Sequence, residues 1–153
     1  MKKIFQYFVT INFIIVIMLY ANHRDLNGDN MDCPHSPNCV SSLASNPSHF
    51  IAPLIFKDRP ELAMQRLKKV LMTEKRVTII TERSDYLYGE IRSLVFRFVD
   101  DVEFTLSIEN KIFQVRSSSR VGYSDFGVNR RRIERIRKKF KNQGFQRLAH
   151  FSE

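Results

Sequence analysis

Two stretches of the sequence carry residue types that can do chemistry. The first is CPHSPNCVSS at residues 33–42, which contains both cysteines of the chain. Outside the reducing cytoplasm, Cys33 and Cys39 at this spacing indicate a small disulfide loop. Two alternatives stay open. Both cysteines could hold zinc together with His35 and His49, or one cysteine could act as a nucleophile with a histidine as its base.

The second stretch, SSSRVGYSDFGVNRRRIERIRKKF at residues 117–140, combines a polar strand end with a burst of arginine and lysine. Arg116, Ser118 and Arg120 alternate along the predicted strand that leads into it, so their side chains project to one side of the sheet. The planar guanidinium of arginine binds a carboxylate or a phosphate at two points. We therefore expect Arg116 and Arg120 to hold an anionic group.

Further polar residues are expected beside these arginines. Glu90 and Arg92 alternate along one predicted strand, and Glu103 lies on the next. Opposite charges on adjacent strands pair across a sheet, so the face is either a solvated, salt-bridged surface or a shallow anion site. A hydrolase that uses Glu90 or Glu103 as acid or base is an alternative function. The candidate ligand-binding residues are Glu90, Arg92, Glu103, Arg116, Ser118, Arg120, Tyr123 and Asp125, of which the last two would form the rim.

The arginine burst has the pattern of an amphipathic helix, in which successive residues point about 100° apart. Its apolar side would consist of Ile133, Ile136 and Phe140. Its solvated side, dispensable for folding, would consist of Arg131, Arg135 and Lys138. Arg130 and Arg137 flank the apolar side and could reach round the edge of the sheet. We therefore expect the burst to be mostly outer surface.

These side chains have to be positioned by a small sheet, because alternating and β-branched apolar residues predict strands between two segments of helical spacing. The predicted strands cover residues 49–56, 76–82, 86–93, 102–109 and 111–119, with an irregular segment at 94–99. One helix is expected at 60–74, with Asp58 as its cap, and another at 129–143, stopped by Gly144. The order predicts a two-layer α+β domain: an antiparallel meander of about five strands with two amphipathic helices on one face.

The N-terminus bears on the compartment of the protein. Lys2 and Lys3 precede an apolar run at residues 4–21 that only three polar residues interrupt. The run predicts a signal anchor or, alternatively, a cleaved signal peptide, and the positive charge before it keeps the N-terminus in the cytoplasm. The domain then lies in the periplasm or an equivalent space of the cell envelope. The expected organisation is a membrane helix at 1–22, a linker at 23–32 and a single domain at 33–153.

Charge and motifs narrow the function classes. The formal net charge of +9 favours anionic partners: acidic ligands, lipid head groups or nucleic acid. Export argues against nucleic acid, because an envelope domain rarely meets it. The sequence contains no nucleophile elbow, phosphate-cradling glycine loop or dinucleotide fingerprint, and no cofactor is predicted. The expected partners are the membrane, through the N-terminal helix, and an anionic ligand or a protein.

Three segments carry a family resemblance. CPHSPNCVSS, FVDDVEF at 98–104 and VRSSSRVGYSDFGVNRRRIERIR at 115–137 resemble the domain-of-unknown-function family numbered 1499, over residues 32–142. Members of that family are often exported or membrane-linked, which agrees with the apolar N-terminus. The resemblance implies no reaction. The function expected from the sequence is therefore a membrane-tethered envelope domain that binds an anionic ligand, a lipid head group or a protein partner.

Overall fold

A sheet with two helices makes up the part of the chain that the computed structural model describes, residues 31–95 and 97–149. The predicted membrane helix at 1–22 lies outside these residues. Within them, no helix combines the length and the hydrophobicity that crossing a membrane requires. The elements are β1 Cys39–Ser41, β2 Leu54–Ile55, α2 Pro60–Met72, β3 Val77–Glu82, β4 Tyr86–Arg92, β5 Val99–Ser107, β6 Ile112–Ser119 and α3 Val128–Ala149.

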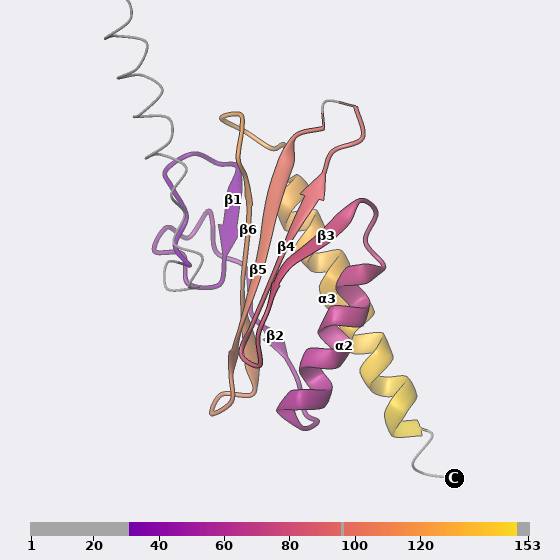
Figure 1. The fold of residues 1–153 in the computed structure, drawn as a ribbon. Coiled ribbons are helices and arrows are strands. Elements are labelled where there is room, and N and C mark those ends of the chain that lie inside the picture. Colours follow the sequence, from indigo (N-terminus) through magenta and orange to yellow (C-terminus); the bar gives the residue numbers. More distant parts are fainter. Residues whose placement is uncertain (1–30, 96, 150–153) are drawn as a thin grey trace, which may run out of the picture. The chain divides into compact units, whose positions relative to one another are not determined.

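The strands form one antiparallel sheet in the order β1-β6-β5-β4-β3, with β2 also paired to β6 (Figure 1). The predicted meander from β3 to β6 is confirmed, and so is the irregular connection between β4 and β5. The described part has six strands where about five were expected. The additional strand is β1, which pairs Ser41 with Arg116 on the edge of β6. It lies in the cysteine loop, whose prolines hide the strand pattern.

Two predicted strands differ in length from the observed ones. The segment 49–56 contributes only the two residues of β2 to the sheet. Pro53 directly precedes β2, and a proline has no N–H to donate to a ladder. The strand predicted at 102–109 ends at Ser107, so Ile108 lies beyond it in the turn and is 62% exposed.

Both helices cover the same face of the sheet, and the hydrophobic core lies between the two layers (Figure 1). The rings of Phe56 and Phe140 pack on Phe113 of β6, with centroids 5.2 and 5.9 Å away. Burying an aromatic or aliphatic side chain of this size stabilises the fold by about 1.5–3 kcal/mol. The fully buried core side chains include Leu54, Leu67, Val70, Leu71, Leu87, Val102, Phe104, Phe113, Val115, Ile133 and Ile136.

Gly89 lets α2 approach the sheet closely. A Cβ at this position in β4 would lie 3.2 Å from the carbonyl oxygen of Thr78 and 3.4 Å from Cδ2 of Leu71. Leu71 belongs to the buried side of α2, so a side chain longer than a methyl group at position 89 would collide with the helix. The glycine thus sets the spacing between the two layers near β3.

The ends of the helices correct two predictions. Arg59, not Asp58, precedes the first turn of α2, and no side chain caps it. Pro60 makes this tolerable, because the first helical N–H has no partner inside the helix in any case. Asp58 instead accepts two hydrogen bonds, of 2.8 and 2.9 Å, from the guanidinium of Arg66.

Gly144 does not stop α3, which continues to Ala149. Gly144 instead leaves space for the side chain of Arg66. A Cβ at Gly144 would lie 3.1 Å from Nη1 of Arg66, whose guanidinium stacks 4.1 Å above the ring centre of Phe140. A glycine in this helix therefore marks the close passage of a side chain from α2, and a helix tolerates one glycine at a cost of about 1 kcal/mol.

Arg130 and Arg137 reach round the edge of the sheet, as their positions beside the apolar side predicted. Arg130 donates to the carbonyl oxygens of Phe50 and Ser48, at 2.8 and 2.9 Å. Arg137 donates to the carbonyl oxygens of residues 52 and 53. The connection between β1 and β2 has few ladder partners, so these arginines supply the hydrogen bonds that its backbone needs.

We predict that Ile136→Asp unfolds the domain and that Lys138→Gln does not. Ile136 is fully buried between α3 and the sheet, so the substitution would bury an unpaired carboxylate. Lys138 is exposed on the same helix, and its replacement should change the free energy of unfolding by less than about 0.5 kcal/mol. Urea unfolding followed by circular dichroism measures both. Equal stability of the two variants would show that α3 presents a different side to the sheet.

Candidate functional site

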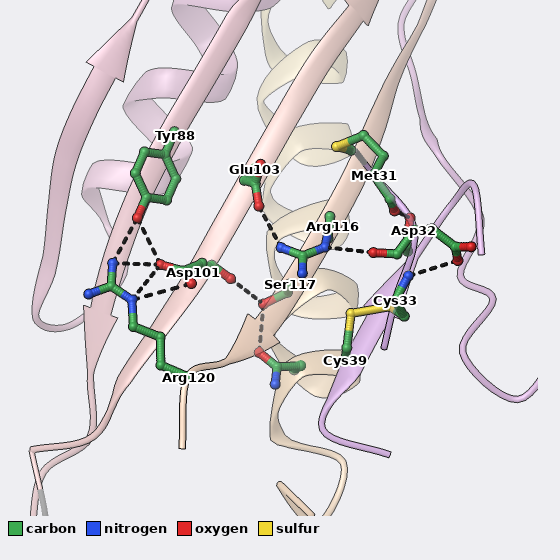
Figure 2. Close-up of polar contacts among 12 residues, drawn as sticks. Met31, Asp32, Cys33, Cys39, Tyr88, Asp101, Glu103, Arg116, Ser117 and Arg120 are labelled. Carbon is green, nitrogen blue, oxygen red and sulfur yellow. Dashed lines mark hydrogen bonds and ion pairs between the residues drawn. A yellow bond between two sulfur atoms is a disulfide. The ribbon is translucent and has the colours of Figure 1, made fainter. Parts of the chain in front are cut away.

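The predicted polar residues do gather on the sheet face that points away from the helices, and they form two clusters (Figure 2). The first surrounds Asp101 of β5, whose side chain is 0% exposed. The hydroxyl of Tyr88 donates to Asp101 at 2.8 Å, and Arg120 donates to the same carboxylate through Nε and Nη2. Nη2 of Arg120 also bonds the hydroxyl of Tyr88 and a carboxylate oxygen of Glu90. Burial alone would lower the pKa of Arg120, but these bonds outweigh it and raise the pKa.

The second cluster has the same composition as the first. It lies two residues away from it on both β4 and β5. The hydroxyl of Tyr86 donates to Glu103 at 2.8 Å, and Nη1 of Arg116 donates to Glu103 at 2.7 Å. Burial and the neighbouring Glu103 carboxylate raise the pKa of Tyr86 well above its ordinary value. The guanidinium of Arg83 lies 4.8 Å from the ring centre of Tyr86. Each cluster therefore joins a tyrosine of β4, a carboxylate of β5 and an arginine that lies in β6 or directly after it.

The segment before β1 closes over Arg116, a placement that the sequence left open. Nε of Arg116 donates to the carbonyl oxygen of Asp32 at 3.1 Å (Figure 2). Cys33 and Cys39 form a disulfide, which confirms the predicted loop and leaves neither thiolate available to bind zinc or act as a nucleophile. Backbone N–H groups of Cys33 and Ser45 donate to the carboxylate of Asp32 and lower its pKa. Arg116 is thus covered by its own chain.

The two clusters neutralise themselves. Their face carries three carboxylates, from Glu90, Asp101 and Glu103, and three guanidinium groups, from Arg92, Arg116 and Arg120. Each guanidinium is already paired with at least one of the carboxylates. An anionic ligand would have to compete with these internal carboxylates, so the face is poorly suited to hold one. The same pairing occupies both carboxylates that the hydrolase alternative requires.

The remaining predicted residues lie near the clusters without joining them. Ser118 is buried and faces Asp101 on one side and Cys39 on the other in the ladder. Tyr123 is exposed beyond the end of β6. Asp125 was expected to form part of the rim, but it caps α3: its carboxylate accepts the backbone N–H groups of Gly127 and Asn129, at 2.9 and 2.7 Å. A carboxylate at a helix N-terminus is favourable because it satisfies unpaired N–H groups.

Arg132 corrects the expectation that the burst is mostly outer surface. It is buried between α3 and the sheet, where it pairs with Asp100 of β5 and donates to Ser117 at 3.0 Å. Asn129, one turn earlier, accepts from both Arg132 and Ser117. Helical spacing contains the signal, because Arg132 precedes the buried Ile136 by four positions and so shares its side of the helix.

A groove opens on the helix side of the sheet, near the start of α3, and the sequence did not predict it. Its volume is about 430 Å³. The turn between α2 and β3, the end of β4 with the residues after it, the start of β5 and the first half of α3 all contribute to its walls. The lining residues are Thr73, Glu74, Lys75, Arg76, Ile91, Arg92, Ser93, Leu94, Asp100, Val128, Arg132, Arg135 and Lys139. Of the predicted site residues, only Arg92 is among them.

Charge in this groove is strongly positive. Its lining holds six basic side chains, of which Arg92 pairs with Glu90 outside the groove. It holds two acidic side chains, Glu74 and Asp100, and both are buried beneath arginines. Glu74 accepts from Arg135 at 2.5 Å and from Lys139 at 2.8 Å. Burial would raise the pKa of Glu74, but these two hydrogen bonds lower it overall. Arg135 was predicted to be solvated and dispensable; it is exposed, yet it covers a buried carboxylate.

Comparison with known proteins identifies the family. The family described as "Protein of unknown function (DUF1499)" matches residues 30–140. The chain belongs to this family. No curated protein and no solved structure matches it.

The DUF1499 segment coincides with the parts that hold the polar clusters together. It begins just before residue 31, where the chain starts to cover Arg116, and it ends at Phe140, the last large core residue of α3. The disulfide, both clusters, the Arg132 network and every residue that lines the groove lie inside it. The residues after 140 and the apolar run at 4–21 lie outside.

We predict that Arg120→Ala lowers the free energy of unfolding by about 3 kcal/mol, because it leaves the fully buried Asp101 without its cation. Arg92→Ala is the matched control. Arg92 is more exposed and pairs with Glu90 at 3.4 Å, so its loss should cost less than about 1 kcal/mol. Thermal and urea unfolding measure both. An Arg120→Ala protein of unchanged stability would mean that Asp101 is satisfied without Arg120.

The lowered pKa of Glu74 predicts acid sensitivity. The pKa is below 4.5 in the folded protein, so the ionised Glu74 stabilises the fold above about pH 4.5. This stabilisation is lost as the pH falls through the folded pKa. Urea unfolding from about pH 6 to about pH 3 should show the decline, and Glu74→Gln should make it shallower. An equally steep decline in Glu74→Gln would place the acid-sensitive group elsewhere.

Proposed function

We propose that this DUF1499 protein is a membrane-tethered domain of the cell envelope that binds a small ligand with a phosphate or carboxylate group. The ligand occupies the groove between α3, α2 and the β3–β4 edge, not the polar face on the other side of the sheet. The proposal rests on one observation: the groove lining has a large excess of positive charge.

The arrangement of the basic groups supports an anion site. The buried Glu74 orients Arg135 and Lys139 from beneath, so these two cationic groups are held in place before a ligand arrives. Preorganised donors lose less conformational entropy on binding, which is a general source of affinity. Guanidinium groups also bind phosphate and carboxylate oxygens at two points.

Two further cations extend this set at the open side of the groove. Lys75 and Arg76 are exposed in the turn between α2 and β3. Nε of Arg76 donates to the carbonyl oxygen of Arg92 at 2.7 Å, which fixes the arginine against β4. No ion pair joins either residue to a carboxylate in the described part of the chain. Their charge remains for a ligand.

The size of the groove limits what it binds. A volume of about 430 Å³ falls in the lower part of the range of small-molecule sites, which is about 300–1,000 Å³. That suits a compact anion and not an extended polymer. The hydroxyl of Thr73 accepts from Lys139, but Lys139 is also paired with Glu74, and the hydroxyl donates to the carbonyl oxygen of Val70. Because this hydroxyl has no free base beside it, we favour binding over catalysis.

Tethering and export are supported by the sequence and by the disulfide. Lys2 and Lys3 followed by the apolar run at 4–21 have the pattern of an N-in signal anchor. The disulfide between Cys33 and Cys39 fits an oxidising compartment such as the periplasm.

Binding of inorganic pyrophosphate, measured by isothermal titration calorimetry on the full chain, tests the groove. Removing both open-side cations with Lys75→Gln and Arg76→Gln should weaken binding about tenfold or more, since one charge-assisted hydrogen bond contributes about 1.5–3 kcal/mol. Lys138→Gln removes an exposed charge on α3 outside the groove, so it is the matched control and should bind like the unmodified protein. An equal loss of affinity in the double variant and in Lys138→Gln would attribute the effect to the overall charge of the protein and refute a groove site.

Topology is tested by a reporter fusion after Glu153. We expect an enzyme that is active only in the periplasm to be active in this fusion, because the positive N-terminus should remain inside. A reporter that works only in the cytoplasm should be silent at the same position. The opposite result would place the domain inside the cell and reopen nucleic acid as a partner.

A further inference from the structure

An exposed apolar patch lies at the end of the sheet where β4 and β6 end. We call it the apolar tip, and it consists of Leu94, Val95, Val121, Tyr123, Phe126 and Val128, all exposed. Val95 and Phe126 are 75% and 87% exposed. Isolated exposed apolar residues are ordinary, but several at one end of a sheet suit a surface that binds something.

The register of the sheet brings the two contributing loops together. Arg92 pairs with Val99, and Asp100 pairs with Ser119, so the connections β4–β5 and β6–α3 leave the same end of the sheet (Figure 1). The backbone N–H of Arg120 donates to the carbonyl oxygen of Val99 at 3.1 Å, which ties the bases of the loops to each other.

The exposure of Phe126 is enforced by hydrogen bonds. Its φ is 51°, in the left-handed region that bulky residues rarely adopt. The carbonyl oxygen of Phe126 accepts from Arg131 at 2.8 Å, and its backbone N–H donates to Ser124. Asn38 holds the carbonyl oxygen of Gly122 at 2.5 Å. Backbone strain held in this way is typical of functional positions, because packing alone would not select it.

Basic residues border the tip. Arg97 is exposed on the β4–β5 connection, and Leu94 and Val128 are shared with the lining of the cationic groove. The carboxylate of Asp125, within the β6–α3 connection, is engaged by backbone N–H groups. Apolar and aromatic side chains beside cations match the interface of an anionic bilayer, where tyrosine and phenylalanine enter the head-group region and arginine meets phosphate.

The segment between the apolar run and the domain is short enough to keep the tip near a membrane. Residues 22–30 separate the apolar run from the described domain, and nine extended residues span about 30 Å at most. The carbonyl oxygen of Asp32 accepts a hydrogen bond from Arg116. Arg116 lies three residues before the end of β6, which corresponds to about 10 Å along the strand. A bilayer that holds residues 4–21 therefore lies within reach of the tip.

We propose that the apolar tip docks onto the surface of an anionic phospholipid bilayer, with Phe126, Val95 and Tyr123 in the head-group region and Arg97 against the lipid phosphates. This contact rests on the loop side chains and not on the groove, so membrane docking and pyrophosphate binding can each fail without the other.

The chain contains no tryptophan, so a single introduced one reports its own surroundings. The full-length Phe126→Trp protein is reconstituted in vesicles that contain phosphatidylglycerol, and its fluorescence is compared with and without brominated lipid. Ile108→Trp is the matched control, because Ile108 is an exposed apolar residue in the β5–β6 turn at the other end of the sheet. We expect blue-shifted, bromine-quenched emission from Phe126→Trp and water-like, unquenched emission from Ile108→Trp.

Two further measurements separate the contribution of lipid charge from that of the apolar side chains. Vesicles of phosphatidylcholine alone should reduce the quenching of Phe126→Trp, because their surface has no net negative charge to attract the basic residue beside the tip. Adding Val95→Ser to Phe126→Trp should also reduce it while leaving pyrophosphate binding intact. Water-like, unquenched emission from Phe126→Trp in anionic vesicles would overturn membrane docking and make a protein the occupant of the tip. Equal quenching at positions 126 and 108 would overturn it as well.

Discussion

The buried ion pair between Arg132 and Asp100 is the interaction on which the rest of the described domain depends. Two charges in a dry interior are tolerated only when both are paired and every donor finds an acceptor. Arg132 meets this condition through Asp100, Ser117 and Asn129, and Asn129 donates in turn to the carbonyl oxygen of Asn38. The start of α3, the centre of the sheet and the loop before β1 are therefore fixed together. A shift of any one would leave a buried polar group unpaired.

This network explains how α3 can both pack on the sheet and position the groove and the apolar tip. Arg132 belongs to the lining of the groove, and Asn129 stands one residue after the apolar tip ends. The side of α3 that packs on the sheet thus also sets the position of the groove and of the tip. Arg130 and Arg137 extend the same helix to the β1–β2 connection, where they bond backbone carbonyls.

The two faces of the sheet use arginine differently. On the face away from the helices, Arg116 and Arg120 are matched by Glu103 and Asp101 and covered in part by the chain before β1. That arrangement stabilises and orients strands without leaving charge for a ligand. On the helix side, the carboxylates are fewer than the cations and lie beneath them. Because surplus positive charge and an open groove lie together on the helix side, that side is the one suited to binding an anion.

Patterns within a few residues were read correctly from the sequence. The meander from β3 to β6, the disulfide and the apolar side of α3 at Ile133 and Ile136 all follow from local spacing. The pairing of Arg116 with Glu103 follows from strand alternation, because directly opposite residues meet across a ladder. At Gly144 a local rule failed because of a distant side chain: the glycine resembles a helix stop only until Arg66 is seen to pass beside it.

The sequence by itself determined the fold class, the order of the elements and which residues share a side of each, because these properties depend on the short periods of helices and strands. Only the tertiary structure decided what each charge does. Whether an arginine is solvent-facing, buried with a partner or part of a groove depends on the segments that fold against it, and those lie far along the chain. Arg131, Arg132 and Arg135 are near neighbours in sequence, yet they bond a loop carbonyl, a buried aspartate and a buried glutamate.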